Sequence, residues 1–138
     1  MTAVFVTHAH IDHVGRIPKL VRDGFRGAVY STPPTRDFAE LMLYDSGELL
    51  EKEAEREKKQ PICSAEDVRR AMEAWEGVAY HKPLNTGPFE AEFFDAGHIL
   101  GSSFLRIKAE GKTIIFSGDL GNSPAPIINP TELLPETD

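Results

Sequence analysis

Three histidines and an aspartate fall within the six residues H-A-H-I-D-H, at positions 8–13, in a chain that has five histidines in all. They directly follow Ala3–Thr7, whose apolar and β-branched residues predict a short buried strand. Side chains alternate along an extended segment, so His8 and His10 should point the same way. This pattern favours a fold with a polar site at the end of a sheet, which is where open sheets place ligands.

The residue types of this segment predict a metal site. Imidazole nitrogens suit zinc and similar transition metals. Asp12 and His13 lie at the predicted turn into the next helix and should approach the same point from another direction. Four donors exceed what one tetrahedral ion with a bound water needs, which indicates two ions close together. The alternative is that these are exposed loop residues, which is the usual explanation for a lone histidine and a poor one for this spacing.

Two further polar residues directly follow predicted strands. His98 stands in D-A-G-H-I-L-G-S and Asp119 in F-S-G-D-L-G, each near glycines that allow close approach of the backbone. Taken alone, His98 could be a hydrogen-bonded core histidine and Asp119 a turn former. Together with residues 8–13 they predict one site, in which the Asp119 carboxylate is suited to bridge two metals. His81 lies in a polar link and is expected at the surface.

The first part of the chain alternates strand, helix and strand, which predicts a parallel pair in an α/β fold. The expected helix spans residues 14–22 and the second strand residues 28–31. Thr32 and Pro33 then predict the start of a long helix that ends near Lys58. Five apolar residues are expected on the inner face of this helix: Phe38, Leu41, Met42, Leu49 and Leu50.

Ser64 and Asp67 form a capping box, which predicts another helix. Its apolar positions follow a helical spacing and are expected in the core: Val68, Ala71, Met72 and Trp75. Residues 83–88 are expected to form a turn-rich link. Three strands should follow, at 90–96, 103–109 and 113–117, with a tight hairpin between the last two.

The composition excludes several classes of protein. A net charge of −7 argues against a surface that holds nucleic acid by its own charge, although metal ions could still attract a phosphate-containing substrate. No apolar run is long enough to span a membrane, and no secretory signal is expected. The single Cys63 cannot form an internal disulfide and is expected to be an inert thiol, which predicts a cytoplasmic protein.

The quoted motifs resemble those of the metallo-β-lactamase superfamily. The surrounding phrases V-T-H-A-H-I-D-H-V-G-R-I-P-K-L-V-R-D-G-F, T-P-P-T-R-D-F-A-E-L-M-L-Y-D-S and D-A-G-H-I-L-G-S-S-F are similar to its β-CASP branch of RNA-processing nucleases. That branch includes the nuclease subunit of the cleavage and polyadenylation machinery and its prokaryotic relatives. The resemblance covers nearly the whole chain and implies an αββα sandwich with a mixed β-sheet. It also implies that the substrate of the complete protein is single-stranded RNA.

The resemblance also implies a two-zinc centre. His8, His10 and His98 would hold one zinc ion, Asp12 and His13 would hold the other, and Asp119 would bridge them. Asp12, His13 and Asp119 are accordingly the candidate catalytic residues. The zinc pair would bind the scissile phosphate and activate a water for in-line attack.

The chain also departs from the family pattern. Family members have several strands before the first motif, and after the last they continue into a β-CASP domain with further histidines. A partial metallo-β-lactamase domain is therefore expected at residues 1–121 and a Pro-rich tail at 122–138. Such a chain should be impaired as an isolated nuclease and could self-associate through an exposed sheet edge. The alternatives are another hydrolase of this fold, acting on a thioester or lactam, and a truncated metal-binding or interaction module without catalysis.

Overall fold

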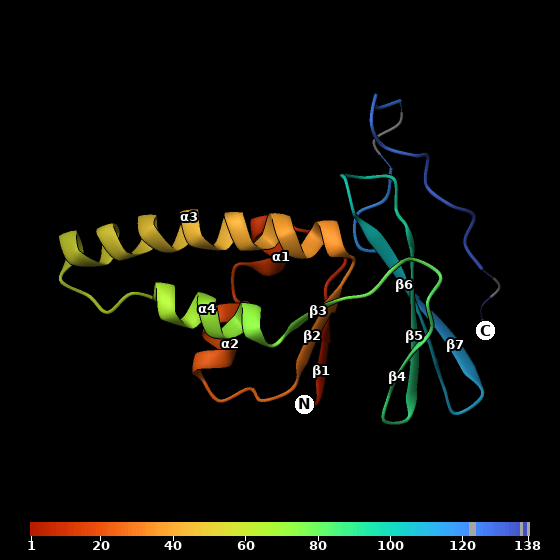
Figure 1. Cartoon of the computed structure of the whole chain (residues 1–138), viewed down its shortest axis with the longest axis horizontal. Helices are drawn as coiled ribbons and strands as arrows, with labels where there is room; N and C mark the ends of the chain where they lie inside the picture. Colours follow the sequence, from red (N-terminus) through yellow and green to blue (C-terminus); the bar gives the residue numbers. More distant parts are fainter. Residues whose placement is uncertain (122–123, 136, 138) are drawn as a thin grey trace.

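The computed structural model describes residues 1–121, 124–135 and 137. A layer of helices packs on a three-stranded sheet, and a four-stranded sheet stands on the other side of that sheet (Figure 1). The element bounds are β1 Ala3–Phe5, α1 Ile11–Val14, α2 Ile17–Arg22, β2 Ala28–Ser31, α3 Pro33–Glu57, α4 Ala65–Glu73, β3 Trp75–Gly77, β4 Leu84–Thr86, β5 Phe89–Asp95, β6 Ser103–Ala109 and β7 Lys112–Phe116. This arrangement confirms the α/β class and the mixed strand directions.

The predicted parallel pair forms between β1 and β2, with α1 and α2 in the connection. A third parallel strand, β3, adds to β2, and the sequence did not predict it. The helical spacing predicts Trp75 in the preceding helix, but that helix ends at Glu73 and Trp75 pairs with Val29. Its side chain is still in the core, as expected, and its indole N–H donates to Ser31 Oγ at 2.8 Å.

Helix α3 begins where predicted, with Thr32 as its N-cap, but its expected inner face is wrong. Phe38, Leu41, Met42 and Leu49 are exposed, and Leu50 is only partly buried. The buried positions recur every four residues and are mostly small: Thr35, Ala39, Leu43 and Gly47, followed by Ala54. The small residue Gly47 lies against Val68 of α4, with 3.9 Å between the position of a Cβ on Gly47 and Val68 Cγ2, so α3 packs on α4 through this face.

A pair of leucines on α3 provides a test of this face. Leu43→Ala should lower the free energy of unfolding by about 2–5 kcal/mol, because it removes a fully buried side chain and leaves a cavity. Leu41→Ala should change it by less than about 0.5 kcal/mol, since Leu41 is 69% exposed and Leu43 only 2%. Urea unfolding of both variants measures the difference. Equal destabilisation would mean that α3 is rotated from the orientation described here.

The second sheet contains the three predicted strands as β5, β6 and β7, joined in antiparallel order. The expected hairpin is present, and Glu110 and Gly111 both take positive φ values at its turn. The predicted link at residues 83–88 instead contains β4, a three-residue strand paired with β5. Strands this short carry too little alternation to be separated from turns by sequence.

Apolar side chains from both sheets fill the space between them. Phe93 and Leu105 of the second sheet are buried beside Phe5 and Tyr30 of the first. The filling is incomplete toward β7, where a cavity of about 380 Å³ opens among Phe5, Thr7, His13, Leu105, Ile107, Phe116 and Gly118. Phe116, which lines this cavity, and Ile114 of the same strand are both more than half exposed.

The segment after β7 folds back on the end of β5. Thr131 Oγ1 donates to the carbonyl of Ala96 at 2.8 Å, and the Glu132 N–H donates to the carbonyl of Asp95 at 3.0 Å. The division of the chain at residue 121 stays a prediction, and residues 122, 123, 136 and 138 of the tail lie outside the described part. Among the described helices, none has the length and apolar character needed to cross a membrane, and the cytoplasmic location also stays a prediction.

Candidate metal centre

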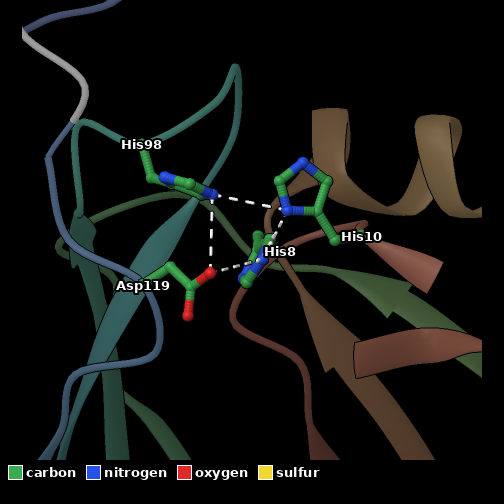
Figure 2. Close-up of side chains that lie close together, drawn as sticks. All are labelled: His8, His10, His98 and Asp119. Carbon is green, nitrogen blue, oxygen red and sulfur yellow. Dashed lines mark hydrogen bonds and ion pairs between the residues drawn. The ribbon is translucent and has the colours of Figure 1, made fainter. Parts of the chain in front are cut away.

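Three histidines and one aspartate point toward one another where strands of the two sheets end (Figure 2). His8 and His10 lie in the segment after β1, His98 in the loop after β5, and Asp119 in the segment after β7. One ligand atom from each of these four residues lies within 4.8 Å of all the others. The sequence-predicted segments, up to 111 positions apart, are therefore brought to one point.

The spacing of these atoms suits a tetrahedral metal ion. His8 Nε2 is 3.1 Å from His10 Nδ1, and His10 Nδ1 is 3.3 Å from His98 Nε2. Asp119 Oδ2 lies 3.7 Å from His8 Nε2 and 3.6 Å from His98 Nε2. Ligands placed 2.0–2.1 Å from a tetrahedral Zn²⁺ are about 3.3 Å from one another. The donor types and their separations thus fit a zinc-sized ion.

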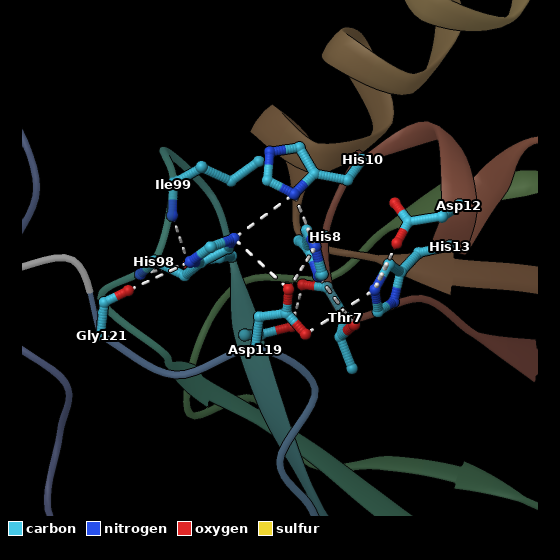
Figure 3. A network of polar contacts seen from close by, with 11 residues as sticks. Thr7, His8, His10, Asp12, His13, His98, Ile99, Asp119 and Gly121 are labelled. Carbon is cyan, nitrogen blue, oxygen red and sulfur yellow. Dashed lines mark hydrogen bonds and ion pairs between the residues drawn. The ribbon is translucent and has the colours of Figure 1, made fainter.

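A second group of donors meets the other oxygen of the same aspartate (Figure 3). His13 Nε2 is 3.7 Å from Asp119 Oδ1 and 3.6 Å from Asp12 Oδ2. Asp119 Oδ2 therefore faces His8 and His98 while Oδ1 faces His13, an arrangement that suits a bridging carboxylate. Asp12 is the most open member, with 77% of its side chain exposed, whereas 47% of Asp119 is exposed.

His8 is the buried centre of the arrangement, with an exposure of 1%. Its burial, helped by the nearby His13 imidazole, lowers the pKa of His8 to about 4. The ring is therefore neutral at pH 7, and a neutral imidazole has a lone pair available for a metal. The ring centroids of His8 and His13 are 4.0 Å apart, so the His8 ring lies between the first donor group and His13 of the second.

Backbone and hydroxyl groups that the sequence did not single out orient two of the imidazoles. Thr7 Oγ1 lies 3.1 Å from His8 Nδ1, and the Gly121 carbonyl oxygen lies 3.1 Å from His98 Nδ1. In both rings Nδ1 has a hydrogen-bond partner outside the cluster, which leaves Nε2 directed into the cluster. Gly118, next to Asp119, has a φ of +53°, and a Cβ there would come within 2.8 Å of the Thr7 side chain.

Two residues lie outside the centre, as expected. The His81 side chain is 53% exposed and its Nε2 is 3.2 Å from Glu132 Oε1. Cys63 is buried, and burial raises the pKa of its thiol, which agrees with an unreactive side chain. Neither residue contributes a donor to the clusters of the described part of the chain.

Residues 1–137 match the family model described as a metallo-beta-lactamase superfamily domain. The chain belongs to the metallo-β-lactamase superfamily. The match includes every residue of the two donor groups, and family membership and the His/Asp cluster together indicate metal binding. A metallo-β-lactamase from Cronobacter sakazakii, described as a HARLDQ motif mutant, shares this fold, with a TM-score of 0.62 at 16% identity. That match covers 94% of this chain and 45% of the Cronobacter chain.

Relatives of this metallo-β-lactamase domain confirm the resemblance to RNA-processing nucleases. The chain is 38% identical over 136 residues to Ribonuclease TTHA0252 of Thermus thermophilus, which covers 99% of this chain and 30% of the relative. It is 38% identical over 120 residues to the transcription termination factor FttA of Methanosarcina mazei, a match that covers 85% of this chain and 18% of the relative. It is 25% identical over 138 residues to Endoribonuclease YSH1 of Kluyveromyces lactis, a match that covers 97% of this chain and 18% of the relative. The chain thus spans less than a third of each of these relatives.

Proposed function

We propose that this chain carries the metal-binding part of a zinc-dependent nuclease that hydrolyses phosphodiester bonds in single-stranded RNA. The observation that carries the proposal is the cluster of His8, His10, His98 and Asp119, whose donor atoms converge at zinc-like separations. The ribonuclease names of the relatives support RNA as the substrate. The fold alone would equally suit a thioester or lactam hydrolase, but the sequence similarity favours the nuclease.

In this proposal His8, His10 and His98 would hold the first zinc ion, and Asp12 and His13 would hold the second. Asp119 directs one oxygen toward each group and would be a ligand shared by both positions. Bound zinc would supply a water of lowered pKa and a clamp on the phosphate oxygens. The protein holds His8 neutral by burial and keeps Asp12, His13 and Asp119 at the open side, where substrate and water have access.

The two metal positions should differ in affinity. The first is surrounded by three imidazoles and a carboxylate, whereas the second has only Asp12, His13 and the shared Asp119 among the described residues. Titration of the metal-free chain with zinc, read by calorimetry, should therefore show one tight equivalent and a second that binds at least about tenfold more weakly. Two equally tight sites would contradict the assignment of ligands, and no tight site would contradict the proposal as a whole.

Self-association is the second expected property of this chain, and the proposed partner is another copy. Among the described strands, β1 and β7 each lie at an edge of their sheet, and a sheet edge is where a strand of another copy can add. Ile114 and Phe116 of β7 add exposed apolar surface at this edge. Sedimentation velocity should show a mass that rises with concentration, and Phe116→Lys should reduce it. A strictly monomeric wild-type chain would exclude this pairing.

A further inference from the structure

The loop that carries His98 is attached to the first turn of α3. Thr32 Oγ1 and Thr35 Oγ1 both donate to the carbonyl oxygen of Gly101, at 2.5 Å and 2.8 Å. Both threonines are buried, with exposures of 1% and 0%, so neither hydroxyl has water as an alternative partner. One carbonyl thus accepts two buried hydroxyl groups from residues 66 and 69 positions away, which is more than a turn of its own needs.

Gly101 is shaped for this contact. Its φ is +82°, a region that side chains with a Cβ rarely adopt. A Cβ at this position would also stand 2.7 Å from Pro34 Cβ and 2.8 Å from the Thr35 amide nitrogen. The backbone of the loop therefore lies directly against the helix N-terminus, without a side chain between them.

Ser102 connects Gly101 to His98 through hydrogen bonds. Ser102 Oγ accepts from the amide N–H of His98 at 3.0 Å and from that of Ile99 at 3.1 Å. The Ser102 N–H donates to the Ile99 carbonyl at 2.9 Å, which closes the turn. His98 is thus fixed from its own backbone, through Ser102, to the carbonyl that the two threonines hold.

We propose that Thr32 and Thr35 are positioning residues for His98, and that the first turn of α3 serves to hold this imidazole against His8 and His10. The inference rests on the proposed function, since His98 matters here as a metal ligand. Neither threonine touches the cluster, so their effect on metal binding is transmitted through Gly101 and Ser102. The sequence stretch T-P-P-T, which otherwise only starts a helix, thereby acquires a role in the metal centre.

Thr35→Val is the variant that tests the proposal. Valine has the shape of threonine without the hydroxyl, and Thr32 keeps its role as N-cap because it accepts from the backbone N–H of residue 35. Losing one net hydrogen bond should weaken zinc binding by about 2- to 13-fold in chelator competition with the full chain. Thr35→Ser keeps a hydroxyl and should restore wild-type affinity.

Ser64→Ala is the matched control. It removes the N-cap hydroxyl of α4, which lies outside the metal centre, so it should lower thermal stability without changing zinc affinity. If Thr35→Val binds zinc like wild type, or if Ser64→Ala weakens binding equally, the threonines are structural only and the proposal is wrong. Should Thr35→Val fail to fold, Thr35→Ala and Thr35→Ser give the same comparison.

Amide hydrogen exchange of the metal-free chain provides a readout that needs no metal. Thr35→Val should speed exchange at residues 98–102 by a similar 2- to 13-fold, whereas Ser64→Ala should affect only α4. A wild-type chain that binds no zinc would overturn the proposed function, and the exchange rates would still decide whether Thr35 holds the loop. Unchanged exchange at residues 98–102 would overturn the positioning role.

Discussion

His10→Ala should weaken zinc binding by at least about 100-fold, because the His10 imidazole lies between two other donors. Its Nδ1 is within 3.3 Å of both His8 Nε2 and His98 Nε2. Partners that only orient a ligand typically contribute 10–100-fold to metal affinity, so removal of a ligand itself should cost more. Competition against a zinc chelator of known affinity measures this loss.

His81→Ala is the control for this experiment. His81 is the fifth histidine of the chain, is mostly exposed, and contacts Glu132 rather than the cluster. Its replacement should leave zinc affinity within about twofold of wild type, since surface substitutions away from a site are nearly silent. Similar affinities for the His10 and His81 variants would show that the metal binds elsewhere or that binding is nonspecific.

The zinc-loaded 138-residue chain should cleave single-stranded RNA at least about 100-fold more slowly than full-length Ribonuclease TTHA0252 under the same conditions. The second donor group offers three residues in the described chain, so the clamp on attacking and leaving oxygens is weak. The six residues of the two donor groups all serve as ligands in the proposal, which assigns none of them to protonate the leaving oxygen, and positioned proton transfer contributes roughly 10²–10⁴-fold in rate. The net charge of −7 should further weaken RNA binding.

A labelled single-stranded RNA, followed by gel electrophoresis, measures this rate. His8→Ala is the control for contaminating nuclease, because it removes the most buried donor of the centre. Residual cleavage that is equal in the two proteins comes from contamination. Cleavage near the rate of the full-length relative, abolished in His8→Ala, would show that these residues form a complete active site.

Three of the donor residues could be predicted because each comes shortly after an apolar strand. His8, His98 and Asp119 follow β1, β5 and β7, and a polar residue after a run of apolar residues can be recognised in the sequence. The roles of these residues as ligands stay predictions, whereas their convergence is now a structural finding.

The inward face of α3 and the contacts of its first turn could not be recognised in the sequence. The inward face of α3 depends on how closely α4 approaches, and the alanine and glycine positions that permit this approach resemble any other helix residues. The bonds from Thr32 and Thr35 to Gly101 join segments more than 60 residues apart and follow no period. Long-range polar contacts of this kind are set by tertiary structure alone.

The donors of the first metal position come from both sheets of the molecule, two from the segment after β1 and two from segments after β5 and β7 (Figure 2). A metal ion held there would cross-link segments that only non-covalent contacts otherwise join. At a free metal concentration 100 times the dissociation constant, such linkage stabilises a folded state by about 2.7 kcal/mol. The supply of metal would then influence how long the folded chain survives proteolysis, apart from any part the metal takes in the proposed hydrolysis.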